Sequence, residues 1–217
     1  HTPTRRQRQM CIRDSKETCL RSETTVKVFD QMRKLQGFTD EGSPGRDWNV
    51  ATGMVIEGKA GFQIMGDWAK GEFTAAGKVP GVDYYCAPTP SNNGYLYNVD
   101  SFIFYKTSDP EKQEGQKLLA KLMMGKNFQK VFNLYKGSIP ARLDVSMDEF
   151  DKCAKTSNSD IKTAGASGGL VPSFAHGMAQ GNTMKAALQD VITEHFNSDM
   201  SSVDAANALA DSVLDNM

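Results

Sequence analysis

Four side chains that could recognise a polyhydroxylated ligand stand at the predicted edges of secondary-structure elements: Trp68, Asp100, Lys136 and His176. The face of an indole can stack on the apolar C–H face of a sugar ring. A carboxylate, an ammonium group and an imidazole can each form a directed hydrogen bond to a hydroxyl. Together these residue types predict a hexose-binding site.

Each of these four residues also has a structural explanation. Trp68 and His176 could be buried in the core, Asp100 could cap an element, and Lys136 could be a solvated loop cation. Residue type alone therefore leaves both the binding roles and the structural roles open.

An enzymatic alternative uses Asp67 and Asp100 as the paired carboxylates of a glycan-processing hydrolase, one as acid and the other as base or nucleophile. Neither residue lies in a pattern that would fix its role, and Asp67, next to Gly66, could cap the following helix. The sequence contains no Gly-x-Ser-x-Gly, phosphate loop, dinucleotide fingerprint or His-Glu-x-x-His motif. We therefore predict a binding protein that is not an enzyme and that uses no cofactor or metal.

The candidate residues are predicted to lie at strand edges and in fixed loops. Trp68 follows an apolar strand at residues 60–65, and Asp100 lies within a strand-like segment at 95–105. The loops that carry the other two candidates each contain a proline, which prevents the preceding element from continuing. One further strand is predicted at residues 84–87.

Apolar residues at helical spacing, together with capping residues, predict the helices. They are expected at residues 23–36, after Asp47, at 67–76, 109–125, 127–135, 147–155, 183–197 and 202–214. Trp48 lies on the apolar side of its helix and is predicted to be core, and residues 165–169 are predicted to be a flexible connector. Ser201 and Asp204 are spaced as a capping box. Helices and strands are intermixed along the chain, so the predicted fold class is α/β.

The composition is typical of a globular protein, with 217 residues, 39% hydrophobic content and a formal net charge of −1. No segment approaches the roughly 20 apolar residues that a membrane-spanning helix needs. The small net charge gives no electrostatic reason to expect nucleic acid or a membrane surface as a partner. After residue 15 there are three cysteines without C-x-x-C spacing, and Cys86 and Cys153 could equally form a disulfide or remain buried thiols.

The first fifteen residues have a different character from the rest of the chain. They contain four arginines against one aspartate, and they resemble the translation of a sequencing-library adapter. We predict that residues 1–15 are non-native and exclude them from the fold. The alternative interpretation is a basic arm that binds an anionic partner.

Residues 17–217 resemble, in order, the extracellular solute-binding proteins of sugar ABC importers, and most of all the bacterial glucose- or mannose-binding receptors. The resemblance is carried by residues 58–68, 98–102, 128–129, 136–142 and 170–177. In that family the matching Trp, Asp, Lys and His line the sugar cleft. The resemblance therefore implies sugar-binding roles for Trp68, Asp100, Lys136 and His176.

The resemblance also implies an architecture and a setting for the protein. It implies a periplasmic-binding-protein-like (type II) fold, in which two α/β lobes close around a monosaccharide such as glucose or mannose. It further implies a monomeric periplasmic receptor that delivers its sugar to the membrane permease subunits of an ABC importer. The match covers only the C-terminal half of such a receptor, so the chain is expected to be N-terminally truncated. Residues 16–97 and 155–217 would then belong to the C-terminal lobe, and residues 98–154 would cross the hinge and complete the N-terminal lobe.

Overall fold

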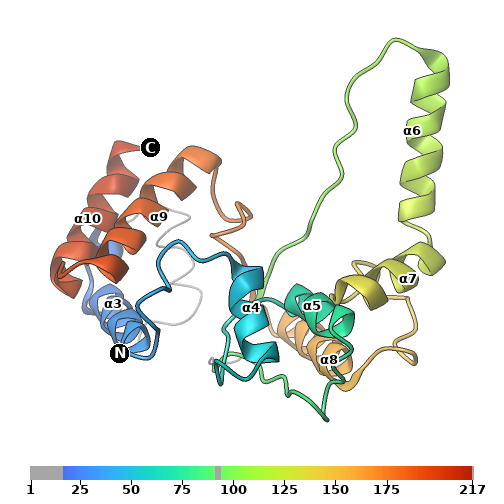
Figure 1. Ribbon diagram of the computed structural model, residues 1–217. Coiled ribbons are helices and arrows are strands. Elements are labelled where there is room, and N and C mark those ends of the chain that lie inside the picture. Colours follow the sequence, from blue (N-terminus) through green and yellow to red (C-terminus); the bar gives the residue numbers. More distant parts are fainter. Residues whose placement is uncertain (1–16, 91–93, 217) are drawn as a thin grey trace. The chain divides into compact units, whose positions relative to one another are not determined.

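The computed structural model describes residues 17–90 and 94–216, which form two compact units (Figure 1). Unit 1 contains residues 17–45, 96–98 and 169–216, and unit 2 contains residues 46–90, 94–95 and 99–168. The predicted adapter-like segment, residues 1–15, lies outside the described residues. No helix in the described ranges is both long and apolar enough to cross a lipid bilayer.

Unit 1 is built around a small helical core. Its helices are α2 (Glu17–Leu20), α3 (Glu23–Gln36), α9 (Asn182–Asn197) and α10 (Ser202–Asp215). Helices α9 and α10 lie side by side and both contact α3 (Figure 1). The core side chains come from all four helices: Leu20, Phe29, Met184, Leu188, Val191, Ala205, Ala206, Leu209, Ala210 and Val213. The helices predicted at 23–36, 183–197 and 202–214 are confirmed.

Ser201, as predicted, caps the start of α10 and contacts Asp204. The backbone N–H of Asp204 donates to Ser201 Oγ at 3.1 Å, and Ser201 Oγ donates to Asp204 Oδ2 at 2.6 Å. The first of these bonds satisfies one of the backbone donors that every helix leaves unpaired at its N-terminus.

Unit 2 contains α4 (Trp48–Ile56), the 3-10 turn η1 (Asp67–Ala69), α5 (Lys70–Ala75), α6 (Pro110–Met123), α7 (Lys126–Lys136) and α8 (Lys152–Ala166). The predicted helices after Asp47 and at 67–76, 109–125 and 127–135 are confirmed. Helix α8 departs from the prediction, because it begins at Lys152 rather than near 147. It also continues through part of the predicted connector, to Ala166. The start is fixed by Asp151, whose side chain accepts a hydrogen bond from Ala154 N at 2.9 Å.

The strand predictions are largely wrong. Among the described residues, one two-stranded sheet pairs β1 (Tyr95–Tyr97) with β2 (Leu170–Pro172), so only the first three residues of the predicted 95–105 strand are extended in a sheet. The predicted strands at 60–65 and 84–87 do not form. A strand is stable only when a neighbour accepts and donates its backbone hydrogen bonds. At 84–87 the pairing is limited to an isolated bridge between Pro80 and Tyr84, and no sheet that the structure describes includes residues 60–65. Phe62 is accordingly 95% exposed.

Side-chain hydrogen bonds attach the 60–66 segment to α4 instead of sheet pairing. Gln63 Nε2 donates to Trp48 O at 2.9 Å, and Gln63 Oε1 lies 2.9 Å from the fully buried Thr52 Oγ1. Trp48 is itself 39% exposed. The prediction that Trp48 is a core residue is therefore wrong, because α4 turns its Thr52 side inward.

The described residues are helix-rich with a small sheet, which agrees with the mixed α/β class in its coarse form. The two units also divide the chain differently from the predicted lobes. Contacts group residues 46–90 with 99–168, whereas the lobe prediction placed 16–97 together with 155–217. The lobe boundaries concern a longer receptor and stay a prediction.

Candidate functional site

Trp68 lies in the 3-10 turn η1, directly after the irregular segment that ends at Gly66. Its indole is partly buried and folds back over the Gly66 backbone. A Cβ atom built on Gly66 would lie 2.1–2.5 Å from three carbons of the six-membered indole ring. The contact leaves no room for a side chain at position 66.

The turn that carries Trp68 is held against the C-terminal end of α7. Gly137 ends α7 with a left-handed φ of 89°, a conformation that favours glycine. A Cβ on Gly137 would lie 2.7 Å from Gly71 N, and a Cβ on Gly71 would lie 2.9 Å from Lys136 O. Two glycines thus allow the backbone of α5 to approach the backbone of Lys136 closely.

Lys136 and Asp100 form an ion pair, so the structure brings two of the predicted site residues into direct contact. The Lys136 side chain is 28% exposed and the Asp100 side chain is 64% exposed. The Lys136 Nζ atom also lies 5.8 Å from the centre of the Phe132 ring, within the range of a cation–π interaction. Trp68, Asp100 and Lys136 all belong to unit 2.

His176 belongs to unit 1, in the loop after β2. It is exposed, so the alternative that it is a buried core histidine is wrong. Its Nδ1 lies 2.6 Å from Ser173 Oγ, and Ser173 is itself 3% exposed. The backbone N–H of Ser173 donates to Tyr97 O at 2.7 Å, which ties this loop to the end of β1.

Asp67 and Asp100 each have a partner elsewhere in unit 2. Burial raises the pKa of Asp67, while hydrogen bonds from the Ser138 side chain and the Ile139 backbone act in the opposite direction. These bonds make Asp67 an anchor between η1 and the loop after α7. Asp100 contacts Lys136, so the geometry does not support the hydrolase alternative.

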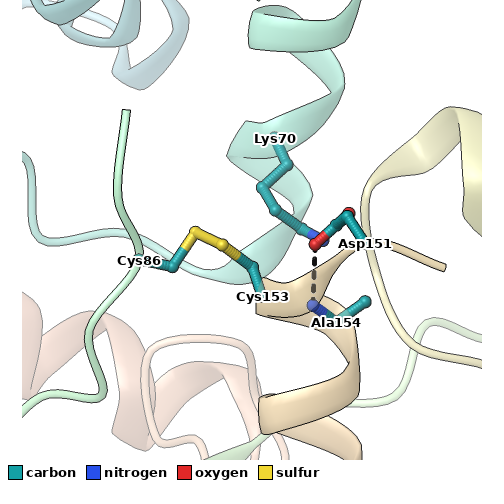
Figure 2. Close-up of a disulfide and its surroundings, with 5 residues drawn as sticks. All are labelled: Lys70, Cys86, Asp151, Cys153 and Ala154. Carbon is teal, nitrogen blue, oxygen red and sulfur yellow. Dashed lines mark hydrogen bonds and ion pairs between the residues drawn. A yellow bond between two sulfur atoms is a disulfide. The ribbon is translucent and has the colours of Figure 1, made fainter. Parts of the chain in front are cut away.

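A buried ion pair between Lys70 and Asp151 also holds the start of α5 in place. Lys70, the first residue of α5, donates to Asp151 Oδ2 at 2.8 Å, and its side chain is only 7% exposed (Figure 2). Burial opposes the charged form of Asp151. Hydrogen bonds from Lys70 and from the Ala154 backbone outweigh this effect and lower its pKa. Lys70 was not among the predicted functional residues, although its spacing from Phe73 on a short helix was a usable signal for a buried lysine.

Cys86 and Cys153 form a disulfide with a Cα–Cα distance of 5.7 Å, beside the Lys70–Asp151 pair (Figure 2). The structure thereby decides between the disulfide and the buried thiols that the sequence left open. Nearby, Tyr84 stacks on Phe73 at a centroid distance of 4.1 Å. Burial and the charge of Asp151 raise the pKa of Tyr84 to about 12, so its hydroxyl stays protonated at neutral pH.

Within residues 17–90 and 94–216, no three His, Cys, Asp or Glu side chains gather in a group that could hold a metal ion. In unit 2, Trp68 offers an aromatic face, and the Lys136–Asp100 pair offers a cation and a carboxylate. Such a set can stack on one face of a ring and hydrogen-bond to its hydroxyls.

Comparison with known proteins gives a consistent set of matches. A family model for bacterial extracellular solute-binding proteins matches residues 13–163. A probable sugar-binding periplasmic protein of Brucella suis biovar 1 (strain 1330) is 46% identical over 195 residues, which is 89% of this chain and 46% of the relative.

Two further relatives show the range of the similarity. A probable sugar-binding periplasmic protein of Rhizobium meliloti (strain 1021) is 42% identical over 201 residues, covering 92% of this chain and 48% of the relative. The xylose/arabinose-binding protein XacG of Haloferax volcanii is 28% identical over 191 residues, covering 87% of this chain and 40% of the relative. The chain spans about half the length of the curated relatives it matches.

Proposed function

Because the chain belongs to the family of bacterial extracellular solute-binding proteins, we propose that it carries part of the sugar-binding site of an ABC-importer receptor. The family match confirms the resemblance seen in the sequence. The relatives are binding proteins, which confirms the prediction that the chain is not an enzyme. The Brucella suis and Rhizobium meliloti relatives are named as periplasmic proteins, and we propose a periplasmic location for the receptor that contains this chain.

The observation that carries the proposal is the contact between Lys136 and Asp100 on the α7 end to which the Trp68 turn is fastened. We propose that the Trp68 indole stacks on a sugar ring while Lys136 and Asp100 hydrogen-bond to its hydroxyls. In the structure, Lys136 and Asp100 form an ion pair with each other. A sugar would share or replace that contact, at small cost because an ion pair with an exposed partner contributes little.

We further propose that His176 takes part in sugar binding, by a ring nitrogen whose orientation is set through the Ser173 contact. The ligand we propose is a monosaccharide, and a hexose such as glucose or mannose is the first choice. The receptor would close on the sugar as a monomer, and the closed form would be recognised by permease subunits in the membrane. Ligand binding would favour the closed form through contacts that the open form lacks.

The test compares the two tryptophans of the sequence. A receptor of the relatives' full length that contains this chain is titrated calorimetrically with D-glucose, D-mannose and D-xylose. We expect Trp68→Ala to weaken sugar binding by about tenfold or more, because an aromatic stacking contact is lost. Trp48→Ala is the matched control, since Trp48 lies on α4 and is 39% exposed.

Unchanged affinity in the Trp68→Ala receptor would remove Trp68 from the site. Failure of all three sugars to bind the parent receptor would refute the proposed function. Tighter binding of xylose than of either hexose would refute the hexose assignment but not sugar binding. We also expect residues 17–216 alone to bind hexose weakly, and micromolar affinity would show that this unit pair is sufficient.

A further inference from the structure

Glycine is required at position 66 because of a neighbouring side chain and not because of its own backbone conformation. Gly66 has φ −74° and ψ 166°, an extended conformation that any L-amino acid adopts. A Cβ there would nevertheless lie 2.1, 2.2 and 2.5 Å from Cζ3, Cη2 and Cε3 of Trp68. Carbon atoms in favourable contact are about 3.5–4.0 Å apart. The indole, and not the backbone, therefore requires the glycine.

The turn that carries the indole is fastened at several points and cannot easily move aside. Asp67 is hydrogen-bonded by Ser138 and Ile139, and Lys70 is paired with Asp151 at 2.8 Å. The backbone O of Asp67 would lie 3.1 Å from a Cβ on Gly137, so this face is also closely packed. A methyl group at position 66 would consequently displace the ring of Trp68 rather than the turn.

We propose that Gly66 is a positioning residue that sets the plane of the Trp68 indole and thereby its stacking on the sugar. The sugar-binding part of this inference rests on the proposed function. The packing part does not, because it depends only on the close approach of the indole to Gly66 within the chain itself. Stacking depends on how much of the ring face meets the ligand, so a tilt of the indole reduces binding without removing any functional group.

The packing part is tested on the ligand-free chain in a Trp48→Phe background, where Trp68 is the only tryptophan. Gly66→Ala is compared with Gly61→Ala, because Gly61 lies in the same segment and a Cβ there meets nothing within 4 Å. We expect Gly66→Ala to shift the emission maximum and to change the acrylamide quenching constant. Gly61→Ala should change neither. Identical spectra for Gly66→Ala and the parent would overturn the inference.

A double-mutant cycle separates displacement of the ring from a general loss of stability. We expect Gly66→Ala to lower the unfolding midpoint when Trp68 is present and to have no such effect in a Trp68→Ala background. An equal loss in both backgrounds would show that the backbone requires the glycine, and would overturn the inference.

The binding part is tested by titrating hexose into the full-length receptor. We expect Gly66→Ala to weaken binding by about tenfold, approaching the effect of Trp68→Ala, while Gly61→Ala binds like the parent. Parent-like binding by Gly66→Ala, when Trp68→Ala is impaired, would overturn the positioning role. Parent-like binding by Trp68→Ala would instead overturn the proposed site, and with it the binding part of the inference.

Discussion

Replacing Asp151 with alanine should destabilise unit 2 more than replacing its partner Lys70 with methionine. Asp151→Ala leaves the Lys70 ammonium group without its carboxylate, and the Lys70 side chain is only 7% exposed. Loss of one partner from a buried ion pair costs about 3–5 kcal/mol. The lower end applies here because Asp151 is 34% exposed and water can reach the site.

Asp151 also caps α8 through the hydrogen bond from Ala154 N, and loss of a cap costs about 1 kcal/mol. The total for Asp151→Ala is therefore about 4 kcal/mol. Lys70→Met keeps an apolar stem of similar length in the buried position. It leaves a partly exposed carboxylate that still caps α8, so we expect a cost of about 1–2 kcal/mol. The double variant should be more stable than Asp151→Ala alone, because the unpaired buried cation is removed.

The assay is urea denaturation followed by tryptophan fluorescence, with linear extrapolation to water. Both tryptophans of the sequence lie in unit 2, so fluorescence reports on that unit. The reasoning would be refuted if Lys70→Met cost as much as Asp151→Ala, or if the double variant were no more stable than Asp151→Ala.

The Lys70–Asp151 pair should make the stability of the folded chain fall as the pH is lowered. The pKa of Asp151 is lowered in the folded chain, so its stabilising contribution is present above its unfolded pKa and is lost as pH falls through the folded value. The stability difference between the parent and Asp151→Asn should therefore shrink below about pH 4. A difference that stayed constant from pH 7 to pH 3 would contradict this account.

Three further predictions concern other parts of the chain. Cys86→Ala/Cys153→Ala should lower the urea-derived stability of unit 2 by about 4 kcal/mol, because the disulfide closes a loop with a sequence separation of 67. Burial and then Arg33 lower the pKa of the fully buried His195, so circular dichroism should show unit 1 losing stability below about pH 6.5, and less so in His195→Gln. Gly115→Ala, in α6 where a Cβ meets nothing within 4 Å, should raise thermal stability by up to about 1 kcal/mol.

The helices of this chain could be predicted because their signals are local. Asp109 followed by Pro110, and the Ser201 capping box, act within one turn of the backbone they stabilise. Helix α8 was misplaced for the same reason. Asp151 caps the helix through Ala154 N and also pairs with Lys70, and the second of these contacts is tertiary and cannot be read from the local sequence.

The strands could not be predicted in the same way, because a strand is completed by a partner that the local sequence does not specify. Residues 60–65 have apolar character, but in the described structure their polar contacts go to α4 through Gln63. Residues 95–97 do pair, with β2 about 75 positions further along the chain. Two apolar segments that look alike in the sequence thus differ in structure, because residues 95–97 form a strand and residues 60–65 do not.

In the candidate site, the residues that could contact a ligand were predictable from their type, whereas the residues that hold them in place were not. Trp68, Asp100, Lys136 and His176 could be selected from their chemistry, and their sugar-binding roles remain proposals. The groups that hold the Trp68 turn are a buried lysine, a carboxylate used as an anchor and glycines in close contact, and these resemble ordinary residues in the sequence. Gly66 is the clearest example, since its φ and ψ suit any residue and only the neighbouring indole excludes a side chain. The requirement for glycine two positions before a tryptophan therefore cannot be predicted from the sequence, because it depends on the indole ring folding back over that position.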